Sequence, residues 1–349
     1  MKIVYQQVNL KLGICIPTYN RFYELKNCLN SIYLSFLKFK KLKFEICISD
    51  NSSNNQNTKT IKFFRKKFKS RVKIKYNRFK TNKGVALNFL KSISMSKAEY
   101  VWTIGDDDLL TSDALKKIYQ LLKKKNKIDY FFINSYNLKL NSLDKKKIIN
   151  TSKISKKMEP FSKIKKSYEL NFFELIDPKV SYDYLMAIYF SIFKKKKWDE
   201  NVKVLNKKLI REKKWISNFD NSFFNQIVFV EAFKDSRAYF QSKPLSINIS
   251  SSRDWRDMYW FLEIVRYPEI LDYYRKKGLG FLRYIYCKNY SLRNFANYHL
   301  KIFINRKKNS GWEYVKIYKN IIANLIYPNA TLSIFYFIFR KIFNNKSQD

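Results

Sequence analysis

The sequence predicts an α/β protein: an open, mostly parallel central sheet with helices on both faces, followed by a helical C-terminal region. Three observations support this. Short apolar runs alternate with segments of helical periodicity over residues 1–110. A polar loop follows each of these runs. Near residue 245 the alternation gives way to helical patterns rich in Tyr, Phe, Trp, Lys and Arg. Alternating strands and helices favour a parallel sheet because a crossover helix connects parallel neighbours.

Four buried strands are expected in the first third of the chain, where apolar runs are bounded by Pro, Gly or polar clusters. The expected strands cover residues 12–17, 44–50, 72–76 and 100–104. Apolar residues at helical spacing predict helices over residues 24–36, 58–68 and 86–95. In such sheets ligands bind beyond the carboxyl ends of the strands. We therefore expect a site in the polar loops that follow these strands.

The rest of the chain is less regular. Further strands are expected at residues 129–135 and 186–193, a surface excursion at 137–166 and an amphipathic helix at 221–233. The change in composition predicts a first domain over residues 1–245 and a helical region over 246–349. The expected C-terminal helices cover residues 255–274, 281–303, 312–325 and 332–343.

Composition excludes several classes of protein. The chain has 70 basic and 28 acidic residues in 349, a net charge of +42, which permits an anionic partner without naming one. A single histidine, His299, rules against histidine-ligated zinc and Ser-His-Asp chemistry. The four cysteines form no Cys-x-x-Cys pair, so we expect reduced, buried thiols and a reducing compartment. We expect neither a signal peptide nor an ordinary transmembrane helix.

The strongest chemical signal is the triplet Asp106, Asp107 and Asp108, directly after the fourth strand. Three adjacent carboxylates repel one another unless a cation or a hydrogen-bond donor compensates them. Mn²⁺ and Mg²⁺ take such oxygen ligands, commonly together with substrate phosphates. The alternative is a solvated acidic turn at the start of the helix that begins near Thr111.

Other strand ends favour the metal interpretation. Pro17, Thr18, Tyr19, Asn20 and Arg21 follow the first strand. The second strand ends in Asp50-Asn51-Ser52-Ser53, and Asn82-Lys83-Gly84 precedes a helix. In this order, over residues 10–112, the motifs resemble those of the inverting glycosyltransferase family two, which has the GT-A fold. The form Gly105-Asp106-Asp107-Asp108 is similar to the abequosyltransferase-like branch of O-antigen and capsule enzymes, although many relatives carry Asp where Gly105 stands.

The resemblance implies roles for particular residues. Pro17, Thr18, Tyr19 and Arg21 would line the nucleotide pocket. Asp50 would accept a hydrogen bond from the base, and Lys83 would lie near base and phosphates. Asp106 would lie near ribose and metal, Asp107 would bind the metal directly, and Asp108 is a further candidate ligand. The implied partners are Mn²⁺ or Mg²⁺ and a nucleoside-diphosphate sugar, with a UDP-sugar as the first expectation.

The resemblance also implies a carboxylate base that deprotonates the acceptor hydroxyl. Asp220, just before the helix 223–233, fits best, and its alternative role is a helix N-cap. Asp183, in a turn before the next strand, is the second candidate. Arg253, Trp255 and Arg256 follow a serine-rich loop and could contact acceptor or diphosphate, or form a salt-bridge cluster at a helix start.

The expected function is therefore a metal-dependent inverting sugar transfer to a glycan acceptor in bacterial surface polysaccharide synthesis. The acceptor would be lipid-linked oligosaccharide, lipooligosaccharide, O-antigen or capsule. The basic aromatic helices of the C-terminal region favour a peripheral position on an anionic membrane, at its cytoplasmic face. Packing on the first domain is their alternative role. The rival function is nucleic-acid binding without catalysis, but it leaves the acidic strand end unexplained.

Overall fold

The computed structural model describes residues 10–53, 56–139, 146–151, 154, 158–181, 188–249, 258–308 and 310–344. Its centre is a ten-stranded sheet with the order β3-β2-β1-β4-β9-β6-β10-β5, while β7 pairs with β6 and β8 with β10. The strands are β1 Leu12–Thr18, β2 Phe44–Asp50, β3 Lys73–Arg78, β4 Tyr100–Thr103, β5 Asp108–Leu110, β6 Tyr130–Leu138, β7 Glu159–Pro160, β8 Tyr168–Asn171, β9 Ser191–Lys194 and β10 Arg237–Ile249.

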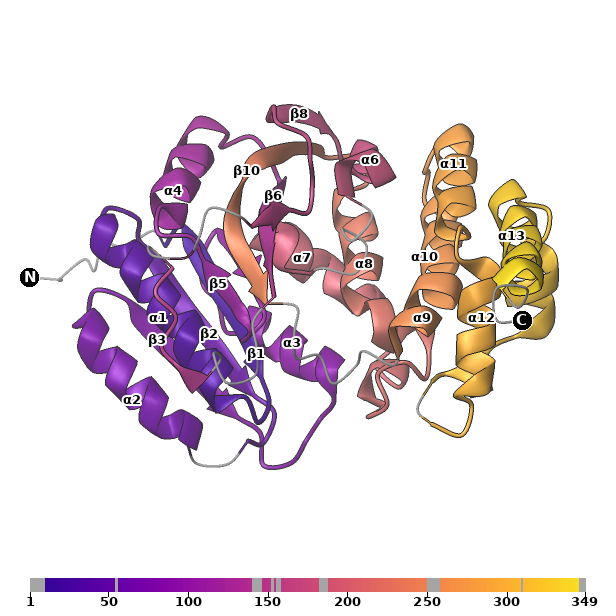
Figure 1. Ribbon diagram of the computed structural model, residues 1–349. Coiled ribbons are helices and arrows are strands. Elements are labelled where there is room, and N and C mark those ends of the chain that lie inside the picture. The colour runs from indigo at the N-terminus through magenta and orange to yellow at the C-terminus, as the bar shows by residue number, and fades with distance from the viewer. Residues whose placement is uncertain are drawn as a thin grey trace, which may run out of the picture.

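Helices cover both faces of this sheet, as predicted (Figure 1). On one side α1 contacts both α2 and α4, and on the other α8 contacts both α3 and α7. The longer helices of this part are α1 Phe22–Lys38, α2 Gln56–Phe68, α3 Val85–Ser94, α4 Ala114–Lys124, α7 Lys195–Asn201 and α8 Phe219–Phe233.

The sheet is parallel only in part. Strand β1 pairs in parallel with β2 and β4, and β2 pairs in parallel with β3, so the first four strands follow the prediction. Beyond them β9 lies antiparallel between β4 and β6. The later pairings are mixed: β10 is parallel to β6 and antiparallel to β5. The prediction of a mostly parallel sheet therefore holds for the N-terminal half of the sheet.

Strand β10 was not predicted from the sequence. It contains Lys243 and Pro244, and its pairing with β6 shifts register between Gln241 and Ser246. Pro is tolerated in a strand at such irregularities, but it interrupts the apolar pattern by which strands are recognised. Because β10 continues to Ile249, the boundary predicted at residue 245 falls inside the central sheet.

The C-terminal helices share a core with the sheet. Tyr267, Ile270 and Tyr274 of α10 belong to the main core cluster, so residues 246–349 do not form a separately packed unit. A second cluster includes Phe261, Leu292 and Ile302. The elements of this region are α9 Tyr259–Phe261, η7 Leu262–Arg266, α10 Tyr267–Lys276, α11 Phe281–Ser291, α12 Phe295–Ile304, η8 Trp312–Tyr314, η9 Ile317–Ile321, η10 Ile322–Asn324 and α13 Pro328–Asn344.

The prediction of reduced, buried cysteines is confirmed. All four cysteines are free thiols and buried. His299 is also buried, and its Nδ1 lies 2.9 Å from the carbonyl oxygen of Phe295, which fits a structural role. No single helix among the described residues has the length and apolarity to cross a membrane, although Ile317–Asn324 and Pro328–Arg340 together reach that level and meet at 87°.

Candidate active site

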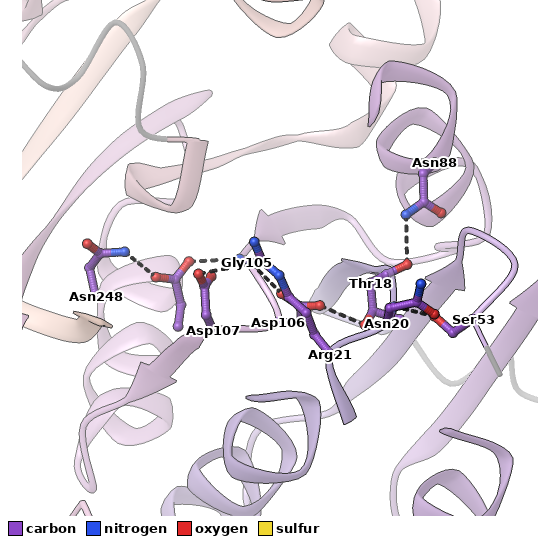
Figure 2. Close-up of polar contacts among 10 residues, drawn as sticks. Thr18, Asn20, Arg21, Ser53, Asn88, Gly105, Asp106, Asp107 and Asn248 are labelled. Atoms are coloured by element: carbon purple, nitrogen blue, oxygen red, sulfur yellow. Dashed lines mark hydrogen bonds and ion pairs between the residues drawn. The ribbon is translucent and has the colours of Figure 1, made fainter. Parts of the chain in front are cut away.

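The carboxyl ends of β1 and β4 are joined through Asp106. Thr18, the last residue of β1, donates its hydroxyl to Oδ2 of Asp106 at 2.7 Å. From the same loop Arg21 extends Nη1 to Oδ1 of Asp106 at 3.3 Å and to Oδ2 of Asp107 at 3.1 Å. Figure 2 shows these groups converging from the two strand ends. The adjacent carboxylates are thus compensated by one shared guanidinium and one hydroxyl.

The two carboxylates differ in their surroundings. Asp106 is buried, and this burial, partly offset by the Arg21 guanidinium, raises the pKa of Asp106 to about 7. The side chain of Asp107 is 15% exposed and that of Asp106 only 5%. Asp107 is therefore the carboxylate that a solvent-borne ligand reaches first.

Asp108 faces the other way, into the protein. Its Oδ2 accepts a hydrogen bond from the backbone N–H of Gly105 at 2.8 Å, and its Oδ1 accepts one from Asn248 on β10 at 2.8 Å. Both oxygens thus already accept hydrogen bonds from the protein, and the predicted role of Asp108 as a metal ligand stays a prediction. These bonds also give Asp108 a part in shaping the turn that presents Asp106 and Asp107.

The same turn explains why glycine stands at position 105. A Cβ atom added to Gly105 would lie 2.6 Å from Oδ1 of Asp107 and 3.0 Å from Oδ2 of Asp108. The first distance is closer than real Cβ atoms come to other heavy atoms. A larger residue at this position would therefore require the Asp107 carboxylate to move from the place it has in this turn.

Asp50 holds the loop that follows β2. Its Oδ1 accepts from the backbone N–H of Ser53 at 2.7 Å, and its Oδ2 accepts from Asn57 at 3.0 Å and from the Tyr76 hydroxyl at 2.8 Å. The residue is fully buried. The predicted contact of Asp50 with a nucleotide base stays a prediction, and the structure adds a role in ordering this loop.

The neighbouring loops are tied to one another by asparagines. Asn51 donates from Nδ2 to Asn82 and accepts from the backbone N–H of Lys83 at 2.7 Å. Asn88 of α3 donates to the carbonyl oxygen of Thr18 at 3.1 Å. Gly84 has φ of +87°, a conformation that glycine adopts without strain. The positions of these polar residues after the strands predicted the loops. They did not predict that the loops contact one another.

Three residues that were predicted to bind the donor nucleotide lie at the edge of the site. Tyr19 is 44% exposed, Lys83 is exposed and Pro17 is partly buried. Ser53 accepts a hydrogen bond from the backbone N–H of Asn20 at 2.7 Å and so fixes the loop that carries Tyr19. Aromatic and cationic side chains at a strand-end opening are suited to contact a base and phosphates.

The candidate base Asp220 lies in the first turn of α8. The side chain that caps this helix is Asn218, which accepts from the backbone N–H of Asn221 at 2.8 Å, so the alternative role of Asp220 as N-cap does not apply. Asn221 also donates to the carbonyl oxygen of Glu212 at 2.7 Å. That oxygen would lie 3.3 Å from a Cβ on Gly84. The start of α8 is thus connected to the donor-side loop.

Four predicted residues fall outside the part of the chain that the structure describes. They are Asp183, the second candidate base, and Arg253, Trp255 and Arg256, the candidate acceptor or diphosphate contacts. Conversely, the sequence did not point to Asn248, because its partner Asp108 is 140 positions away along the chain. Only the pairing of β10 with β5 brings the two together.

The donor atoms at the strand edge fit a hard divalent cation. Carboxylate oxygens are the ligands that Mg²⁺ and Mn²⁺ prefer, and Asp107 offers them at the surface. Within the described ranges no three His, Cys, Asp or Glu side chains converge as a metal-binding group. A cation held by Asp107, with Asp106 behind it, would therefore complete its ligands with phosphate oxygens, as Mg²⁺ commonly does.

A sheet with helices on both faces and carboxylates at the end of β4 is the arrangement of a GT-A domain. Residues 13–196, just over half of the chain, match the profile of glycosyl transferase family 2. The chain therefore belongs to this family, as its strand-end motifs predicted.

Two characterised relatives and one solved structure support this assignment. The chain is 41% identical over 104 residues to the abequosyltransferase RfbV of Salmonella typhimurium, covering 30% of each chain. It is 33% identical over 117 residues to the poly(ribitol-phosphate) β-N-acetylglucosaminyltransferase TarP of Staphylococcus aureus, covering 33% of this chain and 34% of TarP. The matches thus span about a third of each relative.

The fold is also that of a solved structure. S. aureus TarS in complex with UDP-GlcNAc superimposes with a TM-score of 0.55 at 16% identity, over 90% of this chain and 79% of that one. At this level of identity the likeness concerns the fold. It confirms the predicted α/β class with its central sheet and flanking helices.

Proposed function

We propose that this protein is an inverting glycosyltransferase that moves a sugar from a nucleoside-diphosphate donor to a glycan acceptor in bacterial surface polysaccharide synthesis. The observation that carries the proposal is the pair Asp106 and Asp107, bridged by Arg21 at the strand edge of a family 2 domain. The acceptor is a lipid-linked oligosaccharide, lipooligosaccharide, O-antigen or capsule chain. A UDP-sugar is the first candidate donor, since the relatives TarP and TarS are, respectively, named for N-acetylglucosamine transfer and solved with UDP-GlcNAc.

On the donor side, each residue has a physical task. Tyr19 offers an exposed ring to the base, while Arg21 and Lys83 offer positive charge to ribose and diphosphate. Asp106, held by Thr18, orients Arg21 and would lie near the ribose. Asp107 would hold Mn²⁺ or Mg²⁺. Such a cation neutralises charge on the leaving diphosphate.

On the acceptor side, Asp220 takes the proton from the attacking hydroxyl as the new glycosidic bond forms. Attack on the anomeric carbon from the face opposite the diphosphate inverts the configuration there. Asp220 is partly exposed in the first turn of α8, where its carboxylate is open to an incoming hydroxyl. The start of α8 is connected through Glu212 to the loop that carries Lys83 and Gly84, which favours a position facing the donor.

The protein works at the cytoplasmic face of a membrane in this proposal. Several large apolar side chains of the C-terminal region are exposed, among them Leu282, Ile326 and Phe335. Basic residues such as Arg306 and Arg340 occur in the same region. Apolar side chains inserted at the headgroup level together with cations facing anionic lipids are the pattern of peripheral membrane attachment.

The proposal is tested by titrating UDP into the protein by calorimetry, with and without Mn²⁺. In the wild-type protein Mn²⁺ should tighten UDP binding, and Asp107→Asn should abolish that gain while the melting temperature is kept. Asp113→Asn is the matched control, because Asp113 pairs with Lys243 and not with Arg21, which bridges Asp106 and Asp107. If UDP binds equally well with and without Mn²⁺, or if Asp107→Asn keeps the gain, the metal-dependent donor site is wrong.

A further inference from the structure

A cavity lies in the C-terminal half, against the start of α8. This cleft of about 760 Å³ is lined by residues from the beginning of α8, from α10 and from residues 313–319. We call it the α10 cleft. Figure 1 shows α10 beside α8, on the side from which the last helices extend. No residue of the strand-end carboxylate site belongs to its lining.

Aromatic rings form part of the wall. Phe219, Tyr273, Tyr284 and Tyr314 line the cleft, and each is partly exposed. The Tyr273 hydroxyl donates to Glu231 at 2.8 Å, and the rings of Phe219 and Tyr273 lie 5.7 Å apart between centroids. The engaged hydroxyl holds the ring in place. The Lys277 ammonium lies 5.4 Å from the ring centroid, and the part of the ring that stays exposed lines the cleft, where it can contact a weakly polar ligand, as in small-molecule sites.

The charges of the lining favour an anion. Five basic and three acidic side chains line the cleft, all within the described ranges. Each acid already has a cationic partner: Arg266 and Lys319 for Glu269, Lys288 for Asp272, and Lys214 for Glu313. By contrast, Lys276 and Lys316 are exposed, and their ammonium groups have no ion-pair or hydrogen-bond partner among the residues described. Two uncompensated ammonium groups at one opening suit a phosphate.

An apolar surface borders the cleft on the same segment. Lys316 and Lys319 line the cleft, while the intervening Ile317 and Tyr318 are 59% and 77% exposed. These residues begin the bent pair of apolar segments that continues into α13. A ligand held by Lys316 would therefore have an apolar surface next to it on which a hydrocarbon tail could lie.

The opposite wall adjoins the candidate base. Phe219 lines the cleft, and Asp220 is the next residue of α8. Burial and the neighbouring Glu231 raise the pKa of Tyr273 in the cleft wall, and the charge of Asp220 adds a smaller contribution. A sugar resting on Phe219 and Tyr273 would thus bring its hydroxyl groups close to Asp220.

From these observations we infer that the α10 cleft binds the head group of the acceptor, a sugar joined through phosphate or diphosphate to an apolar tail. The sugar lies on the aromatic wall, the phosphate lies between Lys276 and Lys316, and the tail follows the exposed apolar side chains beyond Ile317. This inference rests on the proposed function, because it takes the ligand to be the acceptor.

The test uses the full chain and a synthetic probe, a hexose linked through diphosphate to a farnesyl chain, in detergent micelles. Binding is measured by thermophoresis for the wild type and for the double variant Lys276→Gln with Lys316→Gln. We expect about a tenfold loss or more, since charge-assisted hydrogen bonds are removed. The matched control is Lys40→Gln with Lys41→Gln, which removes the same charge at an exposed site elsewhere.

The outcomes separate this inference from the proposed function. UDP binding should be unchanged in both double variants. Failure of the wild type to bind UDP would contradict the proposed donor site alone, because the probe result does not depend on it. The inference that the α10 cleft binds the probe would be overturned by equal binding in the wild type and in the double variant at Lys276 and Lys316. Equal losses in both double variants would also overturn it. A methyl group in place of the farnesyl chain should weaken binding at least tenfold. Equal affinity for this tailless probe would overturn the lipid-linked ligand.

Discussion

Asn248 on β10 donates its side-chain amide to Oδ1 of Asp108 at 2.8 Å, across 140 positions of sequence. Both residues are buried, and the other oxygen of Asp108 accepts from the backbone of Gly105. This hydrogen bond joins β10 to the turn that presents Asp106 and Asp107. The geometry of the donor site therefore depends on a strand that carries none of the proposed donor ligands.

Asn248→Ala should destabilise the protein by about 1–3 kcal/mol, because it leaves a buried carboxylate oxygen without its donor. It should also weaken UDP binding, since the turn at Gly105 loses one of its fixed points. Thermal unfolding and calorimetry measure the two effects. Asn201→Ala is the control, because among the residues that the structure describes its side chain donates only to the carbonyl of Lys197 in its own helix. Wild-type stability and affinity in the Asn248 variant would contradict the assigned role.

Asp220→Asn should keep donor binding and lose turnover. A general base acts when the acceptor hydroxyl is deprotonated, so the loss should exceed about a hundredfold in kcat with little change in UDP affinity. Steady-state transfer assays and UDP calorimetry on the same preparation separate the two quantities. Turnover above about a tenth of wild type would transfer the role of base to Asp183 or another carboxylate.

The carboxylate of Glu269 should make the free energy of unfolding decrease as the pH falls into the acid range. Burial alone would raise the pKa of Glu269, but Arg266 and Lys319 outweigh it and hold the pKa below its usual range. A lowered folded pKa contributes stability above the unfolded pKa of about 4.3, and this contribution is lost as pH falls through the folded value. Glu269→Gln should therefore cost about 3–5 kcal/mol at pH 7, since it leaves Arg266 buried without its carboxylate.

Urea unfolding of wild type and Glu269→Gln from pH 7 to pH 3 measures this difference, which should shrink toward the acid end. Glu200→Gln serves as control, because Glu200 is 56% exposed and lies 3.9 Å from Lys196. Such a surface pair contributes little. A stability difference for Glu269→Gln that stays constant with pH would show that its carboxylate charge is not responsible.

Phe335→Ser with Tyr336→Ser should reduce membrane attachment. These side chains of α13 are 70% and 68% exposed, so their loss should leave the core intact. In liposome flotation the wild type should bind vesicles containing anionic lipid and release as salt rises. Phe63→Ser, at a 48% exposed site on α2, controls for the loss of an exposed aromatic ring. Equal flotation of both variants would place attachment elsewhere, and no flotation by the wild type would refute it.

Local patterns predicted the N-terminal half of the fold closely. The strand expected at residues 12–17 is β1 Leu12–Thr18, and the helix expected at 86–95 is α3 Val85–Ser94. Both are recognisable because apolar spacing repeats within a few residues. Prediction was weaker where the pattern is interrupted. The helix expected at 281–303 is two helices, α11 and α12, and that expected at 312–325 consists of short helical turns.

The sequence alone determined the family and the loops of the donor site, because residues such as Thr18, Arg21 and Asp106 stand at strand ends that the apolar runs define. Parallel strands bring such ends to one edge whatever the rest of the chain does. Only the tertiary structure decided which carboxylate faces solvent, how Asn248 reaches Asp108, and that α8, α10 and residues 313–319 enclose a cleft. These relations join residues far apart in sequence, and periodicity within a window carries no information about which distant surfaces pack together.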